Sequence, residues 1–182
     1  PEPFDAGLSA GYLSARLGSS RRAVKECLLD QSVVAGIGNI YGDEILFAAG
    51  IAPDRPARSL EREEWERLAS MIPDRLAYFI EKNAITPQEY LETRGRDYRN
   101  TPFLQVYGHG GEPCPVCGAE LRRAVIGGRG SVFCPQCQHL RLDVRGREEC
   151  NIDVIIKLTS KEALTVMTKE EMPACPVRRR WP

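Results

Sequence analysis

The sequence lacks net charge, long hydrophobic runs and repeats, and each absence narrows what the protein can be. Lysine and arginine total 25 and aspartate and glutamate total 25, so the formal net charge is zero. Nucleic-acid-binding proteins usually carry a basic excess, and this balance argues weakly against that class. No apolar run approaches the roughly 20 residues of a membrane helix, and no secretory signal is visible, so we expect a cytoplasmic protein without membrane contact. Neither an internal repeat nor a low-complexity segment is present.

The charges are nevertheless distributed unevenly along the chain. Residues 60–66 are acidic, whereas the later part of the chain is biased toward arginine: Arg94, Arg96, Arg99, Arg122, Arg123, Arg129, Arg141, Arg145 and Arg147. A neutral chain can therefore still present one cationic region. With 42% hydrophobic and 27% charged residues, the 182 residues fit one or two small globular domains.

Four of the seven cysteines form two C-x-x-C pairs, Cys114 with Cys117 and Cys134 with Cys137. Two such pairs about sixteen residues apart supply the four thiolates of a tetrahedral structural zinc site. Disulfide-linked proteins do not usually have their cysteines in two C-x-x-C pairs. We therefore predict one structural Zn²⁺ and a reducing compartment. The other three cysteines, Cys27, Cys150 and Cys175, stand outside this pattern.

A β-hairpin is predicted between the two cysteine pairs. Residues 120–126 and 131–133 have strand character and are joined at the glycine-rich stretch 127–130. Gly118 and Gln138 are predicted to close the turns at the two pairs. Arg129, between glycines at the tip, favours contact with a ligand. The competing interpretation is a zinc ribbon that only closes the fold.

The first half of the chain has the apolar spacing of helices. Residues 8–92 are predicted to form an all-α bundle of four or five helices, which makes the protein mainly α. We expect Trp65, Phe47 and Phe79 in its core, with Cys27 as core packing. The zinc part is expected to have almost no core of its own and to depend on the metal.

The most specific phrase of this half is a glycine turn. Gly36 and Gly38 are predicted to form a turn after a helix that ends near Asp30, with Asn39 as the N-cap of the next helix. Glycines allow close approach of the backbone, and free N–H groups at a helix start suit a phosphate, so this turn can hold a DNA backbone. The competing interpretation is a hinge with a capping asparagine between two packed helices.

Other segments carry weaker predictions. Asp43 and Glu44, one turn further, are predicted to be a solvated or dipole-paired acidic face. Residues 103–107 are predicted to form a short strand. Residues 141–182 match no motif; a strand at 152–158, a helix at 161–172 and a basic end are expected there, as an added subdomain, a DNA-touching tail or sequence read past a natural stop.

The glycine turn and the cysteine pairs together carry a family resemblance. Residues 36–41, Gly-Ile-Gly-Asn-Ile-Tyr, followed by residues 43–51, resemble the helix–two-turn–helix of formamidopyrimidine-DNA glycosylase. Residues 111–118 and 127–138 are similar to that family's zinc finger, in the same order. The resemblance divides the chain into a helical DNA-binding domain at 1–92, a lesion-loop and zinc-finger region at 93–140, and an unassigned extension at 141–182.

This resemblance implies a base-excision-repair protein. Such a protein binds damaged double-stranded DNA, flips out an oxidised purine such as 8-oxoguanine or a formamidopyrimidine, removes it and nicks the abasic strand. Asn39, Tyr107 and Arg129 match family positions that hold DNA phosphates, and the turn of Gly36 and Gly38 is expected to touch the backbone. The four paired cysteines match the zinc ligands.

The same resemblance places the chemistry outside this chain. The family's nucleophile is a proline in an N-terminal β-sandwich domain, which is the expected partner of this monomeric half. Pro1-Glu2 is similar to the start of that domain, where a glutamate follows the proline. It leads directly into residues 8–17, however, and so resembles the linker before the first helix of the family's DNA-binding half. No catalytic residue is therefore expected here. The alternatives are a non-catalytic zinc-finger module or gene fragment that binds damaged or kinked DNA, and a zinc ribbon for RNA or protein.

Two departures from the family pattern affect the expected specificity. Residues 94–100 occupy the position of the family's lesion-capping loop but lack many of the glycine and aromatic residues usual there. The sequence therefore does not predict which lesion is preferred. His109 stands where a cation is common, which predicts one weaker backbone contact.

Overall fold

A computed structural model describes residues 1–84, 87–93 and 99–138. The expected strand, helix and basic end of residues 141–182 lie outside this range, as do most of residues 94–100. The described elements are α1 (Ala10–Leu17), α2 (Val24–Leu28), α3 (Asn39–Ala48), the 3-10 turn η1 (Ala57–Ser59), α4 (Arg62–Lys82), α5 (Pro87–Thr93), the 3-10 turn η2 (Thr101–Phe103), β1 (Arg122–Ile126) and β2 (Arg129–Phe133). None of the described helices is long and apolar enough to cross a membrane.

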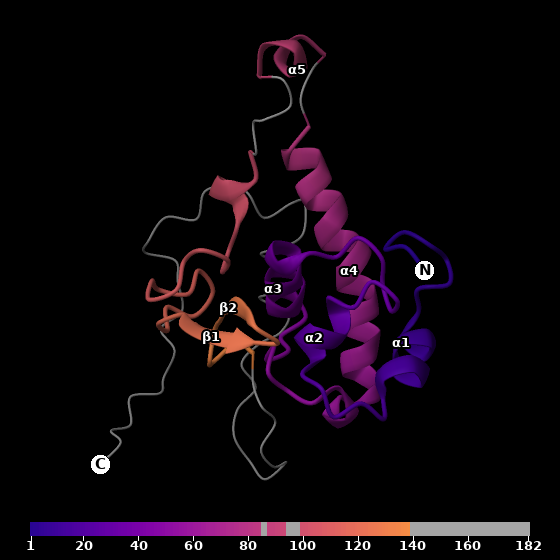
Figure 1. Cartoon of the computed structure of the whole chain (residues 1–182). Coiled ribbons are helices and arrows are strands. Elements are labelled where there is room, and N and C mark those ends of the chain that lie inside the picture. Colours follow the sequence, from indigo (N-terminus) through magenta and orange to yellow (C-terminus); the bar gives the residue numbers. More distant parts are fainter. Residues whose placement is uncertain (85–86, 94–98, 139–182) are drawn as a thin grey trace, which may run out of the picture.

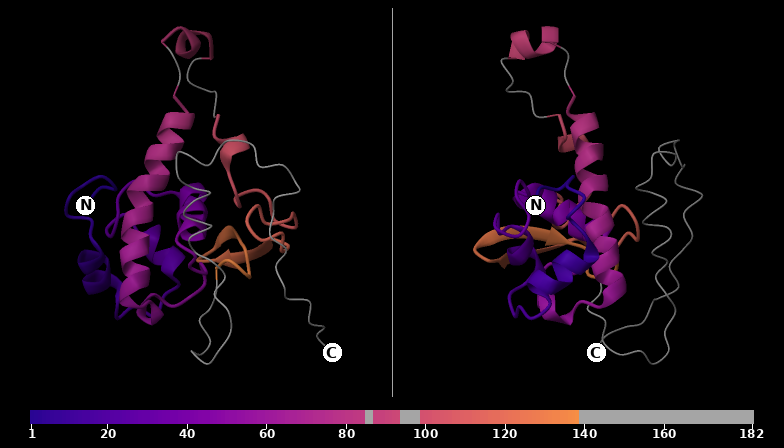
Figure 2. Two further views of the ribbon diagram at one scale, coloured as in Figure 1. Left: turned by 180° about the vertical axis from the view of Figure 1, so that it is seen from behind. Right: turned by 90° about the vertical axis from the view of Figure 1, so that its right-hand side faces the viewer.

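The helices α1 to α4 pack together on one side of the molecule, and the hairpin of β1 and β2 lies against α3 (Figure 1). Helix α4 is the long central element and contacts both α1 and α3. Helix α5 lies beyond the C-terminal end of α4, away from the body of the fold (Figure 2). The predicted helical half is therefore confirmed, with five α-helices among the described residues.

Local sequence explains where two of these helices begin. Ser9 caps α1, because its Oγ accepts the N–H of Tyr12 at 3.2 Å. Glu61 and Glu64 form a capping box at the start of α4, with the N–H of Glu61 bound to Glu64 Oε2 at 2.9 Å. Acidic side chains in this first turn also suit the positive end of the helix dipole.

The apolar residues form two cores. The first lies among α1 to α4 and includes Trp65 and Cys27, both predicted to be there, with relative exposures of 3% and 0%. The second surrounds the cysteine pairs and contains Phe47, Val106 and Leu121. The expectation that Phe47 belongs to the helical core is therefore wrong. Besides three of the paired cysteines, the second core takes Val106, Leu121 and Val132 from the zinc part, and Phe47 of α3 completes it. Helix α3 faces both cores, which sequence periodicity alone does not resolve.

The hairpin is antiparallel, with Arg123 opposite Val132 and Ile126 opposite Arg129. Its turn consists of Gly127 and Gly128, both with positive φ, which matches the preference of tight hairpin turns for glycine. The strand predicted at residues 103–107 is wrong. Residues 101–103 form η2, and the N–H groups that follow are bound by a carboxylate of α3 instead of a neighbouring strand.

Candidate metal centre and nucleic-acid interface

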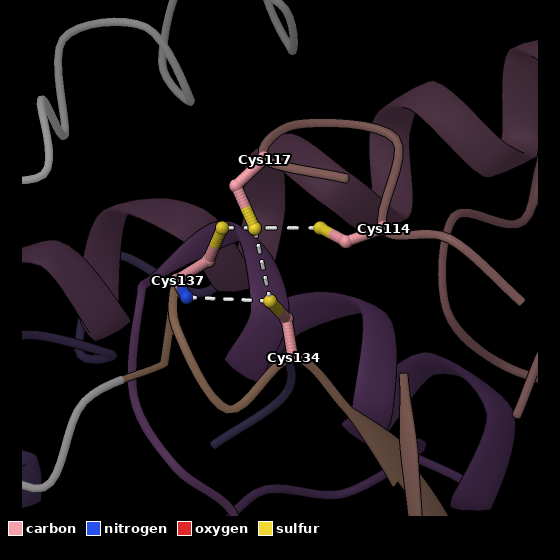
Figure 3. A group of neighbouring side chains, drawn as sticks. All are labelled: Cys114, Cys117, Cys134 and Cys137. Carbon is pink, nitrogen blue, oxygen red and sulfur yellow. Dashed lines mark hydrogen bonds between the residues drawn. The ribbon is translucent and has the colours of Figure 1, made fainter. Parts of the chain in front are cut away.

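The four paired cysteines converge on one point (Figure 3). Their Sγ atoms all lie within 4.8 Å of one another. The Sγ atoms of Cys114 and Cys137 are 3.8 Å apart, and those of Cys117 and Cys134 are 3.4 Å apart. A tetrahedral zinc with Zn–S bonds of about 2.3 Å requires sulfurs about 3.8 Å apart. The four residues therefore fit one structural Zn²⁺, as predicted.

Backbone turns hold each cysteine pair. The N–H of Gly118 donates to the carbonyl of Cys114 at 2.9 Å, and the N–H of Gln138 donates to that of Cys134 at 3.1 Å. Gln138 is buried and also joins the pair to the helical half, because its Nε2 donates to the carbonyl of Ile51 at 2.9 Å. The predicted roles of Gly118 and Gln138 are confirmed.

The chemistry of the four thiols favours a metal. Hydrogen bonds from Cys134 and Cys137 lower the pKa of the Cys114 thiol to about 2. The same bonds raise the pKa values of Cys134 and Cys137, because each thiol donates its proton toward the Cys114 thiolate. Four ionised sulfurs at these distances repel one another, and a bound divalent cation removes that repulsion.

Lys25 of α2 and Asp43 of α3 fasten the hairpin to the helices. Lys25 Nζ lies 2.6 Å from Asp43 Oδ1, and both side chains are fully buried. The ammonium group also donates to Ser131 Oγ at 2.6 Å and to the carbonyl of Gly130 at 3.3 Å. The other oxygen of Asp43 accepts the N–H of Val132 at 3.1 Å. One buried ion pair therefore joins two helices to β2.

The hairpin turn rests directly on α2. Gly127 has φ +57°, and a Cβ atom at this position would lie 2.6 Å from Cγ of Glu26. A larger residue would therefore strain the backbone and push the turn away from the helix. Two consecutive residues of α2 therefore hold the tip of the hairpin, Glu26 by contact with Gly127 and Lys25 by its bond to Gly130.

The acidic pair predicted on a solvated or dipole-paired face is buried, which corrects that prediction. Asp43 and Glu44 are each 1% exposed. Burial is the main influence on Asp43 and raises its pKa, while the bond and the charge of Lys25 lower it. Burial likewise lowers the pKa of Lys25 against the effect of Asp43. Both carboxylates bind segments more than 60 residues further along the chain.

Glu44 positions the segment that carries Tyr107. Its Oε1 accepts three consecutive N–H groups, from Gln105 at 3.1 Å and from Val106 and Tyr107 at 2.9 Å. Burial raises the pKa of Glu44, and these hydrogen bonds lower it. The backbone at Tyr107 is thus fixed to α3 by a buried carboxylate.

Replacing Glu44 by glutamine is expected to destabilise the fold by about 1–3 kcal/mol, because the amide nitrogen removes the Oε2 acceptor of the Gln105 N–H and all three N–H groups lose the charge of their acceptor. Urea unfolding measures this loss, and hydrogen exchange at the Tyr107 amide should become faster. Glu63→Gln, at an exposed position of α4, is the matched control and should leave both quantities unchanged. Equal effects of the two variants would contradict a positioning role for Glu44.

Asn39 and Tyr107, two of the predicted DNA contacts, line one groove of about 670 Å³ between α3 and the hairpin. The predicted capping role of Asn39 is wrong, because Gly38 is the N-cap and Asn39 is the first residue of α3. Its side chain instead reaches the hairpin, where Nδ2 donates to the carbonyl of Gly130 at 3.0 Å. The first N–H bound within α3 is that of Gly42, and the three N–H groups before it have no hydrogen-bond partner among the described residues, as is usual at a helix start.

The other predicted contacts are exposed but do not line this groove. Gly36 has φ +87°, and its N–H is already bound to Gln31 Oε1 at 2.7 Å. Gly38 is extended and exposed just before α3. Arg129 opens β2 beside Gly130, one residue after the turn where it was predicted. The structure therefore brings Asn39 and Tyr107 to one groove, and Arg129 precedes the lining residue Gly130 in the chain.

Sequence reasoning missed the residues that hold this arrangement. Lys25, Asp43, Glu44 and Ser131 have no motif, and a charged residue on a helix usually faces water. One signal was present, since Asp43 and Glu44 immediately precede the apolar run of residues 45–49 and share its helix. Their partners, however, cannot be identified from a single sequence.

Two family models match the chain. The formamidopyrimidine-DNA glycosylase H2TH domain matches residues 1–90, and the zinc finger found in FPG and IleRS matches residues 111–140. These ranges contain the glycine turn and all four clustered cysteines.

Curated relatives of the chain are named formamidopyrimidine-DNA glycosylase. The formamidopyrimidine-DNA glycosylase of Desulfitobacterium hafniense is 49% identical over 138 residues, which cover 76% of this chain and 50% of that protein. The protein of the same name from Bacillus cereus is 44% identical over the same extents. The chain thus spans about half the length of the curated relatives it matches.

Solved structures agree with these relatives. A Lactococcus lactis FPG bound to FAPY-dG-containing DNA superposes with a TM-score of 0.67 at 35% identity, covering 76% of this chain and 50% of that one. The Thermus thermophilus MutM (FPG) protein superposes with a TM-score of 0.66 at 41% identity, covering 76% and 53%. With its helix–two-turn–helix region and its four-cysteine zinc finger, the chain belongs to the formamidopyrimidine-DNA glycosylase family.

Proposed function

We propose that residues 1–138 are the DNA-binding half of a glycosylase and AP lyase that removes oxidised purines from double-stranded DNA. The observation that carries the proposal is the joint at Gly130 and Ser131, where bonds from Lys25 and Asn39 hold the zinc hairpin beside the start of α3. Asn39 and Tyr107 share one groove, and Arg129 stands next to it. Phosphate contacts of this kind fix the position of a protein on the duplex without reading its sequence.

The partner that completes the activity is an N-terminal catalytic domain. The proposal gives residues 1–138 the task of gripping the strand around the flipped nucleotide, while the bond-breaking groups belong to that domain. One monomer would engage one damaged site, in the compartment that holds the DNA, which for a bacterial-type repair enzyme is the cytoplasm. When bound, the zinc supplies structure to the hairpin and takes no part in the reaction.

Binding to a duplex with one abasic site tests this proposal. Fluorescence anisotropy of the zinc-loaded chain is expected to give specific binding that Asn39→Ala and Arg129→Ala each weaken about tenfold, since each removes one hydrogen-bonded phosphate contact. Arg62→Ala is the control for charge, because Arg62 is exposed on α4 and pairs only with Glu66 among the described contacts. Equal affinity of the wild type and the Asn39 and Arg129 variants would overturn the proposal.

Borohydride trapping on the same duplex distinguishes DNA binding from covalent attack on the abasic sugar. Binding without a covalent adduct is expected, because the proposal places the nucleophile in the N-terminal catalytic domain. An adduct would show that an amine of this chain, such as that of Pro1, attacks the sugar and would place part of the chemistry in this half.

A further inference from the structure

Arg123 of β1 is exposed, yet its side chain is held against the neighbouring loop at Gly110, a position called its seat below. One Nη atom donates to the carbonyl of Gly110 at 2.7 Å. A Cβ atom at Gly110 would lie 2.2 Å from Nε and 2.3 Å from Cγ of Arg123. The arginine therefore occupies the space that a side chain at position 110 would fill. An anchored guanidinium loses less side-chain entropy on binding an anion than a freely moving one.

Arg123 also lines the groove that Asn39 and Tyr107 line. Arg123 is the single cation among the lining residues, and none of them is a carboxylate. A guanidinium has five N–H donors, and the bond to Gly110 uses one of them. Because no acidic group of the lining competes for the remaining donors, an anion in this groove meets an uncompensated positive charge.

The same strand adds an apolar contact beside the cation. Val125 lies two residues after Arg123, on the same face of β1, and is 78% exposed at the edge of the groove. A charged group next to an exposed apolar side chain matches a sugar-phosphate unit, in which an anionic phosphate adjoins a less polar deoxyribose. Arg122 lies on the opposite face of the strand and does not line the groove.

We propose that the groove holds one backbone phosphate of the DNA strand, with Arg123 as a phosphate contact beside Asn39 and Tyr107 and with Gly110 as the residue that seats it. This inference rests on the proposed function, because it assigns an additional contact to the same DNA-binding surface. It also assigns a purpose to Gly110, which lacks a positive φ and therefore needs no glycine for its own backbone.

Three variants of the zinc-loaded full chain test the inference by anisotropy on the abasic duplex across a salt series. Arg123→Ala is expected to weaken binding about tenfold and to reduce the slope of log affinity against log salt by about 0.9, the value for one lost phosphate contact. Gly110→Ala keeps every charge but displaces the guanidinium, so it should cause a loss of similar size. Arg122→Ala removes an equal charge from the other face and should change the slope far less.

The double variant Gly110→Ala/Arg123→Ala makes the test sharper. It should bind no more weakly than Arg123→Ala alone, because the glycine acts only through the arginine. Zinc content and urea unfolding are measured for each variant to establish that the hairpin is folded. Equal slopes for Arg122→Ala and Arg123→Ala, or full affinity of Gly110→Ala, would overturn the inference.

The two proposals fail in different ways. If Asn39→Ala weakens binding and Arg123→Ala does not, the DNA grip stands and only the Arg123 contact is wrong. If the wild type and the Asn39 variant bind alike, the proposed function fails, and with it the surface on which the Arg123 contact depends.

Discussion

Replacing Lys25 by methionine is expected to lower the free energy of unfolding by about 3–5 kcal/mol, the cost of leaving one partner of a buried ion pair unpaired. Methionine nearly preserves the length and volume of the side chain, so the loss arises mainly from charge and hydrogen bonding. Asp43 would remain fully buried without its counter-ion, and Ser131 would lose its donor. Urea unfolding of the zinc-loaded chain measures the change.

Two further variants define the origin of this loss. Arg16→Met removes a cation from an exposed position of α1 and should change stability by less than about 0.5 kcal/mol. Adding Asp43→Leu to Lys25→Met should restore part of the loss, because an apolar pair needs no counter-ion. Recovery should be incomplete, since the N–H of Val132 then lacks its acceptor. Strictly additive losses from the two substitutions would argue against a coupled pair.

The ion pair also changes how the two halves of the chain relate to each other. The family resemblance divides the chain into a helical domain at 1–92 and a lesion-loop and zinc-finger region at 93–140. Lys25, Asp43 and Phe47 instead extend from the helices into the hairpin and its core. The Lys25 variant should therefore reduce DNA affinity as well as stability, because Gly130 beside Arg129 would keep its bond from Asn39 but lose its bond from α2.

Features that depend on residues close together in the sequence were predicted, and contacts between residues far apart in the sequence were missed. The cysteine pairs and the glycine turn depend on neighbours a few residues apart, and both were placed correctly. The Lys25–Ser131 bond joins residues 106 positions apart, and the bond from Tyr107 to Glu44 spans 63. Local spacing carries no information about contacts of that kind, so buried charged residues were taken for surface ones.

The segment around Tyr107 was also mispredicted for lack of long-range information, in this case as a strand that the structure does not contain. Its apolar pattern matched a strand, and a strand needs a neighbour for its N–H groups. The structure satisfies those groups with a single carboxylate from α3, an option that a sequence pattern does not encode. The family resemblance grouped Tyr107 with Asn39 as expected phosphate contacts, and the structure gives the physical reason that both residues line one groove.

Removal of zinc is expected to weaken binding to the abasic duplex about 100-fold, because the hairpin that carries Arg123 and Arg129 loses its order and each contact contributes about tenfold. Far-UV circular dichroism should keep most of its helical signal, since the core among α1 to α4 contains none of the four zinc ligands. Its thermal stability should nevertheless fall, because Lys25, Asp43 and Glu44 lose partners on the hairpin and on the preceding loop.

A matched pair of cysteine variants controls for the chelator. Cys114→Ser should lose the metal and bind DNA as weakly as the chelated protein, whereas Cys27→Ser removes a buried thiol that lies outside the cluster and should retain one zinc per chain. Adding Zn²⁺ back should restore the wild type but not the Cys114 variant. Undiminished DNA affinity after chelation would contradict a structural role for the metal in the grip, and loss of the entire helical signal would mean that the two cores unfold as one cooperative unit.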